Sequence, residues 1–242
     1  MTKCILQDYR TDKCEGCDGI CPHYIVFHGR NGKGGKTASA RIPQDYRDVT
    51  FLTTPVRNSQ ADAYRALDAY VKTFKRHLTG GERAKSLYLW SRSPGTGKTT
   101  TAVALLNAWM SVSYLIAMQG GGTSGQGSAY FLDINELQAR YNIATMTRDE
   151  DEIQRIGATI KRLQSAEFAV LDDIGVRAST EAFTAYVHAI INARTSAGLP
   201  TIYTSNLPMD EMSDVFTERL YDRIRDQCLA IHFDGESKRG RR

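Results

Sequence analysis

Ser86-Leu-Tyr-Leu-Trp-Ser-Arg-Ser-Pro-Gly-Thr-Gly-Lys-Thr-Thr100 is the stretch of sequence that decides the fold of this 242-residue chain. The apolar run at 87–90 predicts a buried strand, and the apolar segment at 102–110 predicts a helix after the loop. A strand, a loop that ends in Gly-Lys-Thr and a helix form the context that a phosphate-binding loop needs. In such a loop, backbone N–H groups and the helix N-terminus surround anionic oxygens. We therefore expect the chain to bind ATP or GTP.

Two side chains of this loop are expected to contact the charged groups of the nucleotide and its metal ion. Lys98 supplies a positive charge to the phosphates, and the hydroxyl of Thr99 can hold Mg²⁺. The loop departs from the usual pattern at Arg92, which stands where the first glycine is expected. The residues that we expect to contact the nucleotide are Pro94, Gly95, Thr96, Gly97, Lys98, Thr99 and Thr100.

A second Gly-Lys-Thr occurs at 35–37, and we reject it as a nucleotide site. Ile42-Pro43 would end any helix that follows it, and no adequately long buried strand precedes it.

The composition is that of a globular protein. Apolar residues make up 41% of the chain, and no apolar run approaches the roughly 20 residues of a membrane span. The N-terminus lacks a signal-peptide pattern, so we expect a cytoplasmic protein that does not bind a membrane. The last five residues hold four cations, which account for the net charge of +4. The rest of the chain is balanced, so its charge alone does not predict a nucleic-acid-binding surface.

Four of the five cysteines lie within the first 21 residues. In a reducing compartment, such clustering favours a metal site over disulfides. Three thiolates and an imidazole are the ligand set of a structural zinc site, with an iron–sulfur cluster as the weaker alternative. About 50 residues form too small a core alone, so the metal would hold the module together. The predicted ligands are Cys14, Cys17, Cys21 and His23, with Cys4 or His28 as alternatives to His23.

Short apolar runs alternate with helical patterns after the loop. This alternation predicts an α/β fold in which a mainly parallel, five-stranded sheet lies between helices. An amphipathic helix over 57–77 precedes the sheet, and the glycine-rich stretch 119–128 is interpreted as a surface insertion. The predicted strands are 87–90, 130–134, 168–172, 201–204 and 229–233, and the predicted helices are 98–110, 135–144, 149–164, 180–197 and 213–226.

Polar residues follow two of the predicted strands. Asp172 and Asp173 end the third strand, where the first acid reaches the Mg²⁺ shell and the second orients or deprotonates the attacking water. Asn206 follows the fourth strand and can hydrogen-bond this water or the γ-phosphate. Asp173 is one methylene shorter than the glutamate that many ATPases carry, which leaves the strength of hydrolysis open.

These blocks together resemble the AAA+ family, and within it the replicative helicase loaders of the DnaC/DnaI type. The resemblance covers about residue 57 to the end and implies an AAA+ P-loop NTPase without a C-terminal helical lid. It implies that Asn206 is the first sensor, Arg223 the arginine finger and Arg239 the second sensor. Arg219, four residues before Arg223, is the alternative finger. The matching pieces are 94–99, 171–175, 204–206, 218–223 and 235–239.

The resemblance also implies a domain division and a set of partners. Residues 1–50 resemble the zinc-binding, helicase-contacting module of DnaI-type loaders, 51–82 form a linker helix and 83–242 form the ATPase domain. Implied partners are a replicative hexameric helicase bound by the N-terminal module, single-stranded DNA bound near 135–164, and further copies of the chain bound through the AAA+ domains.

The implied function is a weak, DNA- or partner-stimulated ATPase that delivers the helicase onto single-stranded DNA during replication initiation. ATP with Mg²⁺ would act as an assembly and release switch. One alternative is an IstB-type transposition ATPase that binds duplex DNA and a transposase, and the clustered cysteines favour the loader over it. The other alternative is an adaptor that binds nucleotide with little turnover. A phage, prophage or host origin is left open.

Overall fold

The computed structural model describes residues 4–9, 20–120, 128–175, 180–214 and 217–237. The chain divides into two compact units: residues 1–84 with 99–131, and residues 85–98 with 132–242. The phosphate loop therefore belongs to the second unit, while the helix after it belongs, from its second residue, to the first. The division into residues 1–50, 51–82 and 83–242 stays a prediction.

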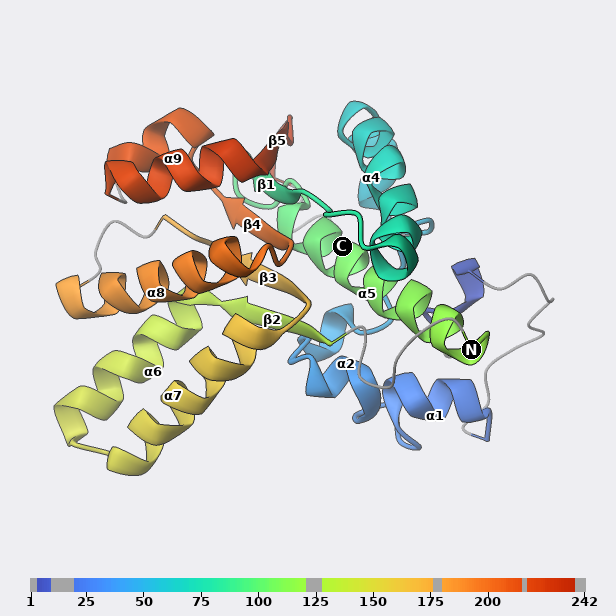
Figure 1. The fold of residues 1–242 in the computed structure, drawn as a ribbon, viewed down its shortest axis with the longest axis horizontal. Coiled ribbons are helices and arrows are strands. Elements are labelled where there is room, and N and C mark those ends of the chain that lie inside the picture. Colours follow the sequence, from blue (N-terminus) through green and yellow to red (C-terminus); the bar gives the residue numbers. More distant parts are fainter. Residues whose placement is uncertain (1–3, 10–19, 121–127, 176–179, 215–216, 238–242) are drawn as a thin grey trace. The chain divides into compact units, whose positions relative to one another are not determined.

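The sheet has five strands in the order β2-β3-β4-β1-β5 (Figure 1). The second unit contains β1, β3, β4 and β5 and the last two residues of β2. The registered pairs β1–β4, β1–β5 and β3–β4 are all parallel. Every residue of β3 and β4 is buried, because both lie inside the sheet, and this is why their sequences are apolar runs. The predicted α/β class and parallel sheet are confirmed. The strands are β1 (Ser86–Trp90), β2 (Ala129–Asp133), β3 (Phe168–Asp172), β4 (Thr201–Ser205) and β5 (Cys228–His232).

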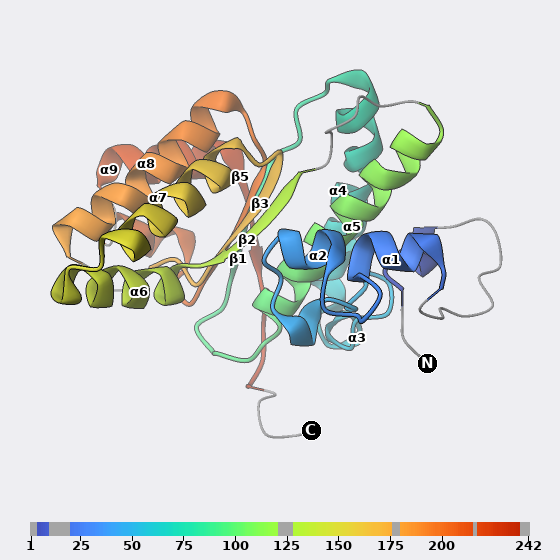
Figure 2. The ribbon, with the colours of Figure 1, turned by 90° about the horizontal axis from the view of Figure 1, so that it is seen from below.

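Helices α6 to α9 lie side by side along one face of this sheet (Figure 2). Side-chain caps fix where α6, α7 and α8 begin. Asp133 accepts the N–H groups of Asn135 and Glu136, and Asp149 and Thr180 cap the next two helices in the same way. The helices are α6 (Ile134–Thr147), α7 (Glu150–Ser165), α8 (Glu181–Ala197) and α9 (Glu218–Gln227).

The predicted helix 213–226 is wrong at its start. A 3-10 helix, η3 (Met209–Asp214), comes first, and α9 begins only at Glu218. Thr217 has an extended backbone (ψ 146°), so the helix cannot run through it. Threonine is a favoured residue at a helix start, and the Thr217 carbonyl accepts the first N–H groups of α9.

The first unit is centred on α5. The ring of Trp109 is fully buried and lies 5.3 Å from the rings of both Phe74 and His77 on α4. The hydroxyls of Tyr64 and Thr101 join the same two helices at 2.9 Å. The helices of this unit are α1 (Pro22–His28), α2 (Gly35–Ser39), α3 (Val56–Ser59), α4 (Ala61–Gly80) and α5 (Lys98–Met118), with η1 (Gln7–Tyr9) and η2 (Gln44–Tyr46).

The N-terminal residues share this core. The ring of Phe27 packs against Tyr114 of α5 at 5.1 Å. Ser111 donates to the carbonyl of Ile5, and Asn107 donates to the carbonyl of Val49. Deleting residues 1–50 would therefore uncover a face of α5.

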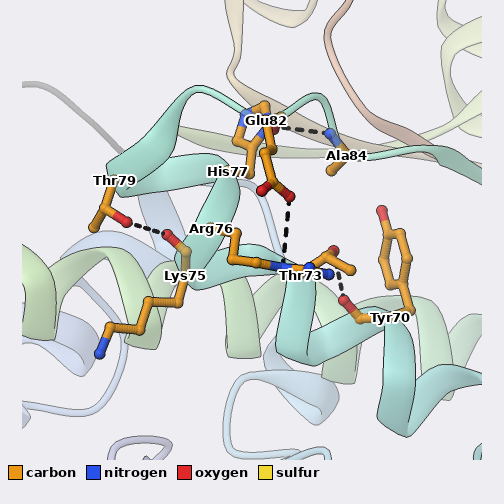
Figure 3. Close-up of polar contacts among 8 residues, drawn as sticks. All are labelled: Tyr70, Thr73, Lys75, Arg76, His77, Thr79, Glu82 and Ala84. Carbon is orange, nitrogen blue, oxygen red and sulfur yellow. Dashed lines mark hydrogen bonds and ion pairs between the residues drawn. The ribbon is translucent and has the colours of Figure 1, made fainter.

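Two helices of this unit depart from their predicted bounds. The helix expected at 57–77 is broken at Gln60, whose ψ of 45° is not helical, and α4 then continues to Gly80. Gly81 ends α4 in the left-handed region that favours glycine (φ 70°). Beyond this end, the N–H of Ala84 donates to Nδ1 of His77 at 3.1 Å (Figure 3). The helix α5 runs eight residues past the expected 110 to 118, because no glycine or proline interrupts it before Gly120.

Within the described ranges, α5 is the helix long and apolar enough to cross a membrane. Its apolar window is 72% buried inside the protein. A helix buried in this way has the pattern of a core helix, and its ring contacts with α4 agree with this interpretation.

We expect the stability of the protein to fall as the pH drops from about 7 to about 5. Burial lowers the pKa of His28 below its usual 6.5, and its Nε2 has no hydrogen-bond partner in the described part of the chain. Between the folded and unfolded pKa values the unfolded chain binds more protons. The contribution of His28 is therefore present above the unfolded pKa and is lost as the pH falls through the folded one. Between pH 7 and about 5, the urea midpoint should shift less in His28→Gln than in the wild type. Equal shifts would contradict the assignment of this pH dependence to His28.

Candidate nucleotide-binding site

The loop between β1 and α5 has the backbone that a phosphate-binding loop requires. Gly95 and Gly97 have φ values of 73° and 102°, which side chains other than glycine rarely allow. Lys98 follows and is 7% exposed. Its Nζ donates to the carbonyl of Ser93 at 3.2 Å and to Oδ1 of Asn206 at 2.9 Å. The ammonium group is thus held beside the loop by the loop itself and by the end of β4.

The departure at Arg92 has a simple structural explanation. The φ of Arg92 is not positive, so its backbone does not require glycine. Its guanidinium points to Glu211 of η3 and forms an ion pair there. The arginine side chain is therefore accommodated without changing the glycine positions that shape the loop.

The two acids lie where the sequence predicts them, at the carboxyl end of β3. Asp172 is 6% exposed and is the last residue of the strand. Asp173 follows with a φ of 61°, the left-handed region that residues other than glycine rarely adopt. Thr204 of β4 contacts both residues: its hydroxyl donates to Oδ1 of Asp172 at 2.6 Å and accepts the N–H of Asp173 at 2.9 Å.

The carboxylate of Asp173 is held by two asparagines. Asn206 donates to Oδ1 at 3.5 Å, the long limit of a hydrogen bond, and Asn135 donates to Oδ2 at 3.0 Å. The structure thus brings Lys98, Asn206 and Asp173 into one polar chain. Asn135 is not among the site residues predicted from the sequence. The signal that identified Asn206, a polar residue just after a strand, would also have identified Asn135, which follows β2.

The other predicted site residues lie elsewhere or outside the described ranges. Arg223 lies on α9, and its guanidinium donates to Oδ1 of Asn192 on α8 at 2.8 Å. The side chain of Arg219 and all of Arg239 fall outside the described residues. Thr99 and Thr100 are the second and third residues of α5. The assignment of Thr99 and Asp172 to Mg²⁺ stays a prediction.

The zinc site also stays a prediction, because Cys14 and Cys17 lie outside the described residues. Cys21 precedes the first turn of α1 and is partly exposed. Nδ1 of His23 lies 2.9 Å from the hydroxyl of Tyr114. Among the residues that the structure describes, no three potential ligands gather into a metal site.

The second Gly-Lys-Thr is used for packing. Thr37 is fully buried, and its hydroxyl donates to the carbonyl of Phe27 at 2.8 Å. The helix α2 that follows is only five residues long. These observations agree with its rejection as a nucleotide site.

The strand order and the polar chain at the strand ends define a P-loop nucleotide-binding protein with an AAA+ type of fold. More specifically, the chain belongs to the family of IstB-like ATP-binding proteins, whose family model matches residues 76–242. It is homologous to the DnaC and DnaI replicative helicase loaders, and this confirms the resemblance noted in the sequence.

The curated relatives are similar over most of this chain. The replicative helicase loader DnaC of Escherichia coli K12 is 24% identical over 183 residues, which are 75% of this chain and 65% of that protein. The replicative helicase loader DnaI of Bacillus subtilis strain 168 is 24% identical over 221 residues, covering 83% of this chain and 61% of that protein. The chain therefore spans less than two thirds of the length of these relatives.

Solved structures share the fold. The crystal structure of the DnaC helicase loader aligns with a TM-score of 0.58 at 22% identity, covering 79% of this chain and all of that one. The crystal structure of DnaI aligns with a TM-score of 0.57 at 20% identity, covering 82% of this chain and 94% of that one.

Proposed function

We propose that this protein is a cytoplasmic, ATP-dependent loader that delivers a replicative hexameric helicase onto single-stranded DNA. Homology to two helicase loaders supports the proposal. The observation that carries its chemistry is the polar chain of Lys98, Asn206 and Asp173 beside the glycine loop. ATP would switch the protein between assembled and released states.

The residues have distinct roles in this proposal. Lys98 would turn from Asn206 toward the β- and γ-phosphates, which would free the amide of Asn206 to orient the attacking water. Asp173 would accept the proton of this water. Mg²⁺, held by Thr99 and Asp172, would neutralise charge on the phosphate oxygens. Hydrolysis would be weak until a partner or DNA repositions Asp173, because both its carboxylate oxygens are engaged by asparagines.

The partner contacts extend this proposal beyond the nucleotide site. The N-terminal module would bind the helicase, with zinc held by Cys14, Cys17, Cys21 and His23. A hydrogen bond at Nδ1 of His23 would leave Nε2 to ligate the metal. Single-stranded DNA would bind near 135–164, and Arg239 would act as the second sensor. Further copies of the chain would bind through the AAA+ domains.

The test is co-purification of the full-length chain with a candidate hexameric helicase, with and without ATP. Deleting residues 1–50 is unsuitable because it would expose α5, so the matched variant is Cys14→Ser/Cys17→Ser. We expect this variant to lose stoichiometric zinc and helicase binding while retaining ATP binding. Helicase binding that survives the loss of both cysteines would contradict the role of the module. Binding to duplex DNA and a transposase, without any helicase retained, would favour the IstB-type alternative.

The proposed arginine finger can be tested by mixing two inactive variants. Lys98→Ala cannot use its own nucleotide, and Arg223→Ala cannot supply the finger, so each alone should show background hydrolysis. In a mixed assembly, Lys98→Ala would supply Arg223 to the intact loop of its neighbour, and about a quarter of wild-type phosphate release should return. Arg219→Ala in place of Arg223→Ala is the matched control. A mixture that stays inactive with Arg223→Ala and recovers with Arg219→Ala would move the finger to Arg219.

A further inference from the structure

Thr204 occupies a position that neither the motif nor the family match assigns a role. It is the fourth residue of β4 and is 1% exposed. Its hydroxyl lies between the two acids, bonded to the side chain of Asp172 and to the backbone of Asp173. A single buried hydroxyl therefore links the carboxylate of Asp172 to the backbone of Asp173, the two acids whose separate tasks the proposed function requires.

The direction of these two hydrogen bonds follows from elementary chemistry. A backbone N–H can only donate, so the Thr204 hydroxyl must accept from Asp173. Its one proton is then committed to Asp172, whose oxygen must accept it. This hydrogen bond, 2.6 Å long, fixes the orientation of the Asp172 carboxyl group beside β4.

The backbone of Asp173 also depends on β4. Its left-handed φ of 61° is unfavourable for a residue with a side chain, so neighbouring contacts must maintain it. The Thr204 carbonyl accepts the N–H of Ile174 at 2.9 Å, and Ser205 donates to the carbonyl of Ile174 at 2.8 Å. Together with the bond to the Asp173 N–H, the bond to the Thr204 carbonyl extends β4 pairing past the end of β3 and holds Asp173 in this conformation. The bond from Ser205 holds only the following residue, Ile174.

We propose that Thr204 is a positioning residue: it holds the metal-binding carboxylate of Asp172 and the backbone of Asp173, and so sets the two acids in one fixed relation. This inference rests on the proposed function of the two acids. Threonine suits the task better than serine, because its β-branch restricts rotation about χ1 and keeps the hydroxyl between its two partners.

Three variants test the inference. Thr204→Val keeps the shape and removes the hydroxyl, Thr204→Ser keeps the hydroxyl, and Ser205→Ala removes a neighbouring hydroxyl that holds Ile174 but does not touch Asp172. The measurements are phosphate release against Mg²⁺ concentration, binding of a fluorescent ATP analogue in EDTA, and thermal melting. Should Thr204→Val melt below the assay temperature, Thr204→Ala is measured in its place.

We expect Thr204→Val to need about 10- to 100-fold more Mg²⁺ for half-maximal hydrolysis, with metal-free nucleotide binding unchanged within about twofold. Thr204→Ser should restore the Mg²⁺ requirement to within about threefold of the wild type, and Ser205→Ala should leave it unchanged. An unchanged Mg²⁺ requirement in Thr204→Val, or the same shift in Ser205→Ala, would overturn the inference. A wild type without Mg²⁺-dependent hydrolysis even when single-stranded DNA and helicase are present would instead refute the proposed function.

Discussion

Replacing Lys98 by alanine is expected to weaken ATP binding by roughly 10- to 150-fold, since hydrogen bonds to charged groups contribute about 1.5–3 kcal/mol. The loss of hydrolysis should be larger, because the ammonium group also stabilises charge that develops on the γ-phosphate. The fold should survive the change, because Lys98 starts a helix and alanine is a good helix former. The hydrogen bonds from Nζ to Ser93 and Asn206 join the loop to the end of β4 and do not hold the core of the sheet.

The chain offers a matched control for this variant. Lys36 occupies the same place in the second Gly-Lys-Thr but is exposed, so Lys36→Ala should bind ATP like the wild type. Titration with a fluorescent ATP analogue and a phosphate-release assay measure the two effects. Equal ATP affinity in Lys98→Ala and Lys36→Ala would contradict the nucleotide site. A wild type that binds ATP but shows the same near-zero turnover as Lys98→Ala would support the adaptor alternative.

The sheet and most of the loop chemistry can be predicted from the sequence, for one physical reason. Strands buried on both faces of a parallel sheet must be continuously apolar, and so polar residues are conspicuous where such strands end. Asp172, Asp173 and Asn206 stand out in this way, and the structure places all of them at the carboxyl ends of β3 and β4. The strand bounds agree with prediction to within one residue for the same reason.

Polar residues inside an element carry no such signal. Thr204 has the pattern of an ordinary β-branched strand residue, and only the register of β4 beside β3 places its hydroxyl between the acids. The break at Gln60 and the extended Thr217 are likewise invisible to helical periodicity, because a polar residue is permitted in either conformation. Arg194 is a stronger case: one arginine in a helical pattern is expected in solvent, and the structure buries it completely.

Replacing Arg194 is expected to cause the largest loss of stability of any single change considered. Its guanidinium donates to the carbonyls of Leu163 and Ala166 at 2.6 and 2.7 Å, to the carbonyl of Pro200 at 2.9 Å, and to the hydroxyl of Thr201 at 2.8 Å. These bonds tie the end of α7 to the start of β4. Burial lowers the pKa of Arg194 to about 10, so it stays charged at neutral pH.

Arg194→Met should lower the free energy of unfolding by about 3–5 kcal/mol, because methionine fills much of the space but leaves buried carbonyls without donors. Arg194→Lys should also destabilise the protein. The single ammonium group of lysine cannot donate to all the acceptors that lie in different directions around the planar guanidinium. Urea unfolding measures both. The control is Arg155→Met on α7, whose exposed guanidinium makes a 3.4 Å ion pair with Glu152 and should leave the urea midpoint unchanged. A urea midpoint for Arg194→Met equal to that of the control would show that solvent or a rearranged backbone satisfies the carbonyls. The side chain of Arg194 would then not be needed to hold β4 in place.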